Sequence, residues 1–364
     1  MLLYWMLFYI PAFFALVGHQ RKKKNTDPYS IHLNALWLIL IIFLTLFIGF
    51  RIEVGGDWYA YLRVYQGMSR QENFFDTDIV FLIGADPGYL FVNWISGQFN
   101  WGIYGVNLIC GLIFSIGLSF FCRTLPRPLL ALCVAIPYLV IVVGMGYSRQ
   151  AAALGVMLLG FIALTREKRV LFIILVLIAM TFHKTAIILA PIAALAANKN
   201  RTQNIFFLSI LFGVLYFNFL ADPFETLYRN YIESQDAQSQ GAYIRAAMNL
   251  IPSIIYLIWP HRFNFHHNEQ SLWKIVSLIS LGLLVLLFIF PDFSTAIDRI
   301  ALYMLPIQLV IFSHLPDIFK AKNAVSKILI LMIIFYYSAV LFVWLNFAIH
   351  AHGWLPYRNL LIDF

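Results

Sequence analysis

Long apolar runs, broken by few charged residues, constrain this chain more than any other feature of its sequence. Charged residues make up 12% of the 364 residues, and the mean hydropathy is +0.80, whereas soluble domains carry about 25% charged residues. A backbone inside lipid must satisfy its hydrogen bonds within helices or within a closed barrel. Barrel strands alternate polar and apolar residues, and these runs are apolar throughout. The sequence therefore predicts an all-α polytopic membrane protein.

About twelve transmembrane helices are predicted, and residues 1–364 are interpreted as a single transmembrane domain. The longest apolar segment contains Gly97–Asn100, so we expect an interfacial helix there, followed by a crossing from about residue 103. The apolar segments lie near residues 2–18, 31–50, 88–122, 129–146, 150–165, 170–182, 185–197, 204–221, 246–260, 271–290, 296–315 and 326–347.

The sixth and seventh segments can be one helix over residues 170–197 or two helices that form a hairpin. Basic residues flank them on both outer sides, and the positive-inside rule places both flanks in the cytoplasm, which favours the hairpin. Thirteen residues at about 1.5 Å each give roughly 20 Å, less than the ~30 Å hydrocarbon core. The tip of the hairpin, at His183 and Lys184, is therefore expected to be recessed below the outer surface.

The distribution of charge predicts the orientation of the chain. The densest basic cluster, residues 21–24, marks the first connection as cytoplasmic, so the N-terminus lies outside, and twelve crossings return the C-terminus there. With this topology the cytoplasmic segments carry a net charge of +12 and the external segments −4. The basic composition therefore reflects orientation and not nucleic-acid binding. The external segments long enough to carry function are residues 51–87, 222–245 and 348–364.

The first external segment opens with a charged loop beside two glycines. Arg51 and Asp57 flank the Gly55-Gly56 pair, which allows a tight turn and close approach to a ligand. Charges at a membrane edge, in a chain with so few, are candidates for function. The alternative is a charged collar that only ends a helix.

Arginine dominates the predicted external cations. Arginine binds phosphate oxygens in a bidentate manner and tolerates drier sites better than lysine. Four cations stand at the external start of inward-running helices, where the helix dipole disfavours a cation by ~0.3–1 kcal/mol; an anion held between them would remove this conflict. Alternatively, each one snorkels or pairs with a nearby acid, as Arg299 could with Asp298. The four are Arg149, Lys184, Arg245 and Arg299.

Several short motifs resemble the EpsG-type branch of the Wzy-like bacterial polysaccharide polymerases, over roughly residues 30–360. The first is Arg51 followed by Val54-Gly55, Asp57-Trp58 and Tyr61. The others are Tyr147–Ala151 with its Arg-Gln pair, Phe182–Ala186, Asp298–Tyr303 with its Arg-x-x-x-Tyr, and Trp354–Tyr357.

This resemblance implies a GT-C-like membrane glycosyltransferase. Such an enzyme joins oligosaccharide repeat units carried on undecaprenyl pyrophosphate, at the periplasmic face of the bacterial inner membrane, to build O-antigen, capsule or exopolysaccharide. It implies no cofactor, metal or nucleotide, and it implies a flippase and a chain-length regulator as partners. Asp76-Thr77-Asp78 is an Asp-x-Asp, which holds a divalent cation in nucleotide-sugar transferases; because the triplet is predicted to be external, where nucleotide sugars are absent, and is common by chance, it is given no metal role.

The site predicted from these motifs combines an anion clamp with a base. Arg51, Arg149, Arg245 and Arg299, supported by Lys184, are placed on the pyrophosphate. The base is either Asp57 or His183, and Asp57 is favoured because Arg51 and the two glycines would hold it. The remaining predicted substrate contacts are Arg229, Trp58, Tyr61, Tyr231 and Tyr303.

Other functions remain open at this stage. A transferase that resembles O-antigen ligases differs only in the acceptor. A lipid-linked oligosaccharide flippase would carry polar residues along the depth of several helices, and a transporter of small anions would show inverted repeats. Because the ionisable residues gather at the outer edge, the sequence favours an enzyme.

Overall fold

The computed structural model describes residues 1–18, 34–76, 86–195, 213, 241–318 and 323–362. Within them the regular secondary structure is helical, apart from one isolated β-bridge between Arg51 and Asn359. Five of these helices are long and apolar enough to cross a membrane, at Gly102–Thr124, Ser148–Thr165, His267–Ile289, Pro291–His314 and Ala324–Phe347. The chain is thus an all-helical membrane-type protein in the described residues, and the twelve crossings and external termini remain predictions.

The helices follow the predicted apolar segments closely. The long third segment divides, as expected, into α5 (Pro87–Gln98) and α6 (Gly102–Thr124). The segment near residues 204–221 lies outside the described residues. The other elements are α1 (Leu2–Val17), α2 (Ala35–Gly49), α3 (Trp58–Met68), α7 (Pro128–Ala135), the π-helix η2 (Ile136–Gly144), α8 (Ser148–Thr165), α9 (Arg169–Phe182), η3 (Lys184–Leu189), α10 (Ala190–Leu195), α13 (Ala242–Ile258), α14 (His267–Ile289), α15 (Ser294–Met304), α16 (Pro306–His314) and α17 (Asn323–Phe347).

Local sequence signals fix where several helices begin. The Asn34 side chain caps α2 by accepting a hydrogen bond from the Trp37 amide at 3.3 Å. Pro87 and Pro128 occupy the first turns of α5 and α7, where a missing N–H costs nothing. The His266 amide donates to the Glu269 carboxylate at 3.1 Å, half of a capping box that starts α14.

A single helix over residues 170–197 is not formed. Helix α9 ends at Phe182, and the 3₁₀-helix η3 begins at Lys184, so the helical path breaks at His183. The break falls where the hairpin prediction places its tip. The reversal of direction that a hairpin requires remains a prediction.

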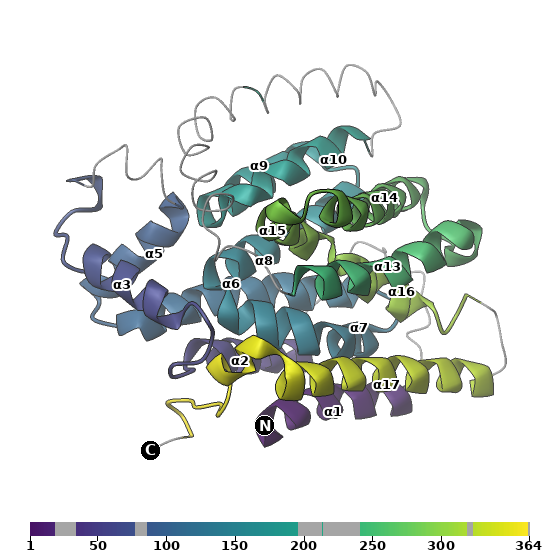
Figure 1. Ribbon diagram of the computed structural model, residues 1–364, viewed down its shortest axis with the longest axis horizontal. Coiled ribbons are helices and arrows are strands. Elements are labelled where there is room, and N and C mark those ends of the chain that lie inside the picture. The colour runs from purple at the N-terminus through teal and green to yellow at the C-terminus, as the bar shows by residue number, and fades with distance from the viewer. Residues whose placement is uncertain (19–33, 77–85, 196–212, 214–240, 319–322, 363–364) are drawn as a thin grey trace. The chain divides into compact units, whose positions relative to one another are not determined.

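The chain forms two compact units, and the first comprises residues 1–159, 181–183 and 312–364. In this unit α1 and α17 run side by side, and α2 packs against α6 (Figure 1). Helices α6 and α8 approach closely where Gly117 meets Gly155, because any Cβ at Gly117 would collide with the Gly155 backbone. Small residues at a helix contact are typical of membrane proteins, where close packing drives association.

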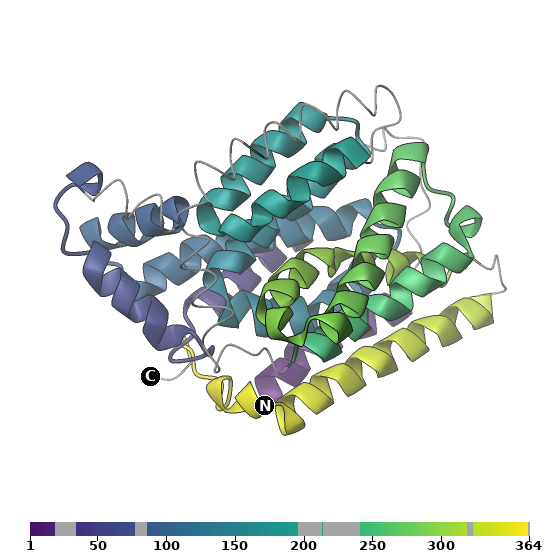
Figure 2. The ribbon, with the colours of Figure 1, turned by 45° about the horizontal axis from the view of Figure 1, so that its top comes forward.

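The second unit comprises residues 160–180 and 184–311. Helices α13, α14 and α15 pack against one another in it (Figure 2). The 3₁₀-helix η3 packs against α15, and α10 packs against α14. This unit therefore brings η3, α13 and α15 into one helical bundle.

In the first unit, the C-terminal tail forms backbone hydrogen bonds with the loop that follows α2; we call this arrangement the clasp. The Ile52 amide donates to the Arg358 carbonyl at 2.9 Å, and the Gly55 amide donates to the Gly353 carbonyl at 2.7 Å. On the other side, the Leu360 amide donates to the Phe50 carbonyl at 2.9 Å. Segments about 300 residues apart in the sequence therefore fix each other's backbone.

The tail also donates a hydrogen bond to the buried π-helix η2. All nine residues of η2 are buried, and π-helical geometry is uncommon and is frequent at functional sites. The Trp354 indole N–H donates to the Ile141 carbonyl within η2 at 2.7 Å. The Tyr4 hydroxyl in turn donates to the Trp354 carbonyl at 2.9 Å. Trp354 thus links α1 to η2.

We expect Gly55→Ala to destabilise the protein by about 1–3 kcal/mol. Gly55 has φ +111°, and a Cβ there would collide with the Met145 carbonyl oxygen. The matched control is Gly67→Ala in α3, where nothing lies within 4 Å and alanine should stabilise the helix by roughly 0.5–1 kcal/mol. Thermal unfolding of the purified protein in detergent measures both. Equal melting temperatures for the two variants would contradict the close approach of Gly55 to the Met145 carbonyl.

Candidate functional site

Arg51 is a buried structural cation at the base of the loop. Its side chain donates from Nε to the Val54 carbonyl at 3.0 Å and from Nη1 to the Ile48 carbonyl at 2.6 Å. Nη2 donates to Asn107 Oδ1 at 3.0 Å and to Ser148 Oγ at 2.8 Å. Burial lowers the pKa of Arg51 to about 10, which still leaves it charged at neutral pH.

In this geometry Arg51 binds groups of its own unit, and its assignment to a pyrophosphate stays a prediction. The residue is 1% exposed, and its donors are directed to carbonyl, amide and hydroxyl oxygens of its own unit. A planar fork with several donors suits such a network better than lysine does. Arg51 therefore joins the end of α2, the loop, α6 and the start of α8. Because its α8 partner is Ser148, it also positions the residue that follows Ser148, Arg149.

Asp57 stands at the N-terminal end of α3, half-buried. The Tyr61 hydroxyl faces its Oδ2 at 3.5 Å, a long hydrogen bond. The argument that Arg51 holds Asp57 is wrong, because the four hydrogen bonds of Arg51 go to other groups. That reason for preferring Asp57 as the base is therefore lost.

Arg149, Asp86 and His183 form the charged centre of the first unit. Arg149 Nη1 lies 2.8 Å from Asp86 Oδ2, and His183 Nδ1 lies 3.9 Å from the same oxygen. The Arg149 guanidinium also lies over the rings of Tyr61 and Tyr89, at 5.6 and 5.8 Å. Cation–π contacts of this kind hold a guanidinium in place without neutralising it. The predicted residues Arg149, Tyr61 and His183 are thus brought together.

Local sequence explains how these three side chains meet. Asp86 precedes Pro87, which starts α5, and Arg149 lies in the first turn of α8. The residue after Pro87 is Gly88, whose missing side chain leaves room for Thr181 near the end of α9; a Cβ would collide with the Thr181 hydroxyl. The close approach of α5 to residues 181–183 brings Asp86 next to His183.

Asp86 is the functional candidate that the site prediction omitted. Its carboxylate is 7% exposed, while the Arg149 side chain is 42% exposed. The available signal was an Asp-Pro-Gly sequence that opens an apolar helix. Only the packing of α5 against residues 181–183 reveals its partners.

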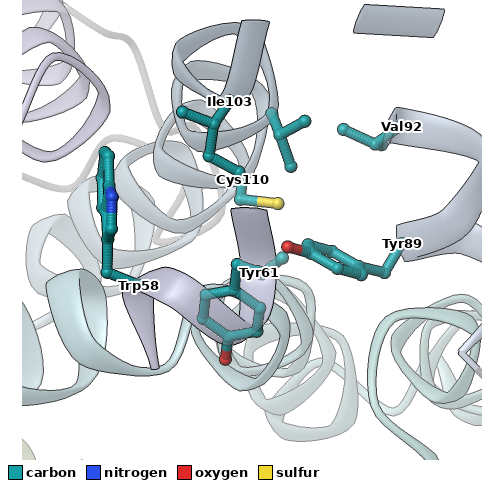
Figure 3. Packing of buried hydrophobic residues seen from close by; sticks show 8 residues of the cluster. Trp58, Tyr61, Tyr89, Val92, Ile103 and Cys110 are labelled. Atoms are coloured by element: carbon teal, nitrogen blue, oxygen red, sulfur yellow. The ribbon is translucent and has the colours of Figure 1, made fainter. Parts of the chain in front are cut away.

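Trp58 and Tyr61 belong to a hydrophobic cluster, and their assignment as substrate contacts stays a prediction. They are 5% and 4% exposed and pack with Tyr89 and Cys110 (Figure 3). The Arg51 guanidinium lies 5.7 Å from the Trp58 ring. A sugar ring needs an accessible aromatic face, and these faces are largely covered. Rings of the cluster instead lie against the guanidinium groups of Arg51 and Arg149.

In the second unit, Arg245 is paired with a carboxylate of the protein. Its guanidinium donates from Nε and Nη2 to the two carboxylate oxygens of Asp298, and both side chains are buried. Asn249, one turn along α13, donates to the Ala301 carbonyl at 3.1 Å and accepts from Gln308 at 2.7 Å. Arg245 therefore stabilises the α13–α15 contact, and its assignment to a pyrophosphate stays a prediction. The local acid Asp298 pairs with this arginine.

The remaining predicted residues fall into two groups. Lys184 begins η3, and Arg299 and Tyr303 lie one turn apart on α15, against which η3 packs. Their assignment to substrate stays a prediction. Arg229 and Tyr231 lie outside the described residues, as does most of the predicted external segment 222–245.

The fold and the site define a membrane-embedded helical protein whose described residues include charged side chains held in hydrogen-bonded networks around Arg51, Arg149 and Arg245. A model of the EpsG family matches residues 34–359, nearly the whole chain, and the chain belongs to the EpsG family. This confirms the family predicted from the motifs, and membership indicates a membrane polysaccharide polymerase. No curated protein matches the chain, and neither does any solved structure.

Arg51→Lys should lower the free energy of unfolding by about 1–3 kcal/mol. Lysine keeps the charge but cannot reproduce the fork, so buried acceptors such as Asn107 Oδ1 lose their donor. The matched control is Arg358→Lys in the same clasp, since the Arg358–Glu53 pair is half exposed and such pairs contribute less than about 1 kcal/mol. Thermal unfolding compares the two; an equal loss would show that Arg51 is not structural.

Proposed function

We propose that this protein polymerises oligosaccharide repeat units carried on undecaprenyl pyrophosphate, at the outer face of the bacterial inner membrane. The single observation that carries the proposal is the Arg149–Asp86–His183 cluster. It combines a half-exposed guanidinium, able to bind phosphate oxygens, with a histidine able to accept a proton near neutral pH. Family membership supports the polymerase class.

The proposed reaction is a displacement at the anomeric carbon of the donor chain. A hydroxyl of the acceptor repeat unit forms the new glycosidic bond while the bond between the anomeric carbon and the phosphate oxygen breaks. Undecaprenyl pyrophosphate leaves, and Arg149 stabilises the charge that develops on it. The acceptor hydroxyl gives its proton to His183, which we now prefer to Asp57 as the base. Arg299 and Lys184 remain predicted ligands of the pyrophosphate.

The structure supports His183 over Asp57 because of what lies beside each group. His183 is mostly buried and faces a carboxylate 3.9 Å away, and a carboxylate in that place can stabilise the imidazolium that forms as the ring accepts a proton. Asp57 has only the long contact with Tyr61. Asp57 is therefore proposed to contact the acceptor sugar, with Tyr61 connecting it to Arg149.

A ligase-like transferase is the second candidate. It would use the same donor and the same cluster, and it would differ in the acceptor. A repeating product therefore distinguishes the polymerase, because a ligase transfers one chain to a different acceptor and gives no ladder.

Purified protein, incubated with lipid-linked repeat units in EDTA and without nucleotide, should yield a ladder of longer glycans on a gel. Arg149→Ala should abolish it, since one lost contact to developing charge costs about 10²–10³-fold in rate. His183→Ala should act similarly, by about 10²–10⁴-fold. Arg299→Ala should also abolish the ladder if that residue binds the pyrophosphate.

The control is Asp76→Ala, which removes the first acid of the Asp76-Thr77-Asp78 triplet and should leave the ladder intact. A ladder that survives both Arg149→Ala and His183→Ala would refute the proposed site. A ladder that disappears in EDTA and returns with a divalent cation would overturn the metal-independent mechanism.

A further inference from the structure

Helices α3 and α5 form a two-helix platform in the first unit, and its exposed surface takes no part in the charged cluster. The two helices pack side by side (Figure 1). One face of α3, which includes Trp58 and Tyr61, is buried. A Cβ at Gly97 of α5 would collide with Ser69, which follows α3, so the C-terminal ends of the two helices are in close contact.

The opposite face of α3 is exposed and cationic. Tyr59, Arg63, Gln66 and Arg70 are exposed, and their spacing of four, three and four residues places them along one side of the helix and of the turn that follows it. Residues 58–71 contain these two arginines and no acid. Among the residues that the structure describes, neither arginine forms an ion pair. Both guanidinium groups are therefore available to an anionic partner.

An exposed group of aromatic rings, here called the aromatic patch, lies next to this cationic face. It consists of Phe74 and Phe75 of the 3₁₀-helix η1 (Phe74–Asp76) and of Phe91 and Trp94 of α5. The ring centroid of Phe74 lies 5.2 Å from that of Phe91 and 6.0 Å from that of Trp94. Phe75 is 82% exposed and Phe91 is 42% exposed. The rings therefore form one continuous surface that is largely open.

The turn after α3 joins the cationic face to the aromatic patch. The Gln71 carbonyl accepts hydrogen bonds from the Trp94 indole N–H at 3.2 Å and from the Gln98 side-chain amide at 3.0 Å. Arg70 directly precedes Gln71, so it stands at the edge of the patch. Trp94 thus has its polar end satisfied while its ring packs among phenylalanines, an arrangement that suits a boundary between polar and apolar surroundings.

A bilayer interface matches both surfaces at once. Aromatic side chains gather at the headgroup level of membranes, and phospholipid phosphates at the same level bind arginine. Three of the four rings of the aromatic patch are phenylalanines, which lack the polar group that tyrosine and tryptophan carry. An apolar partner therefore suits the patch better than a sugar chain does.

We propose that the α3–α5 platform lies in the bilayer interface, with the aromatic patch against lipid acyl chains and with Arg63 and Arg70 on the phosphates of anionic phospholipids. Its consequence for the donor rests on the proposed function. The Arg149 guanidinium lies over the Tyr61 ring of α3 and the Tyr89 ring of α5, so a platform at this depth holds Arg149 at the level of the headgroups. A pyrophosphate carried on a lipid then reaches Arg149 without leaving the membrane.

The place of the aromatic patch is tested with a fluorophore attached at Phe75→Cys, in protein reconstituted into phosphatidylcholine bilayers. The native cysteines are buried, and labelled wild-type protein measures their background. Acyl chains that carry bromine should quench the fluorophore strongly, and aqueous iodide should quench it weakly. The matched reference is Phe335→Cys, at a position that is 77% exposed on the membrane-spanning candidate α17. Strong quenching by iodide without quenching by brominated lipid at Phe75→Cys would overturn the proposal.

The two arginines are tested with the same fluorophore at Gln66→Cys, which lies between them. Brominated phosphatidylglycerol should quench it more than brominated phosphatidylcholine does, and salt should reduce the difference by screening. Replacing Arg63 and Arg70 by glutamine should reduce the relative association constant for phosphatidylglycerol by about fivefold for each arginine, whereas Arg63→Lys with Arg70→Lys should preserve it. The control is Arg358→Gln, because Arg358 already pairs with Glu53 at 2.7 Å. An unchanged constant in the double glutamine variant would overturn the phosphate contact.

Neither measurement needs a substrate, so the two proposals can fail separately. A lipid-facing platform in a protein that forms no glycan ladder would support this inference and refute the proposed function. A protein that forms the ladder while its platform faces water would do the reverse.

Discussion

The burial of the Arg51 guanidinium is the interaction on which the rest of the first unit depends. An isolated charge cannot enter a protein interior in lipid without partners, because desolvation outweighs any packing gain. Four hydrogen bonds, to residues at the end of α2, in the loop, on α6 and at the start of α8, meet that requirement. These contacts bring distant segments together. One of the partners is Ser148, so they also fix the position of the adjacent residue, Arg149.

The C-terminal tail completes this arrangement from the opposite end of the chain. Its backbone pairs with the loop on both sides of Arg51, and the Trp354 side chain reaches the buried π-helix. π-Helical geometry is rare, and the indole N–H of Trp354 donates to one of the carbonyl oxygens of this π-helix. The tail is therefore part of the structure that holds the candidate site and not an accessory to it.

Buried ionic groups take two different forms in this protein. Arg245 and Asp298 are both buried and are joined by two hydrogen bonds within their own unit, an arrangement that fixes helix register. The Arg149–Asp86 pair is asymmetric, since one partner is exposed and the other is covered and lies near a histidine. That asymmetry is what makes the second pair suitable for chemistry, although both look alike as isolated charges beside helices.

The sequence by itself determined the helical membrane class, most of the helix boundaries and the family, and it favoured a break at His183, because hydropathy and short motifs are local properties. It also singled out Arg149, His183 and Tyr61. Only the tertiary structure decided which cations are structural and which are accessible: the guanidinium groups of Arg51 and Arg245 donate hydrogen bonds within the protein, whereas Arg149 stays half-exposed. It also decided that Trp58 is covered and that Asp86 lies at the centre of the charged cluster. The physical reason is that a charge acquires its role from the groups that desolvate and neutralise it, and those groups come from segments far away in the chain.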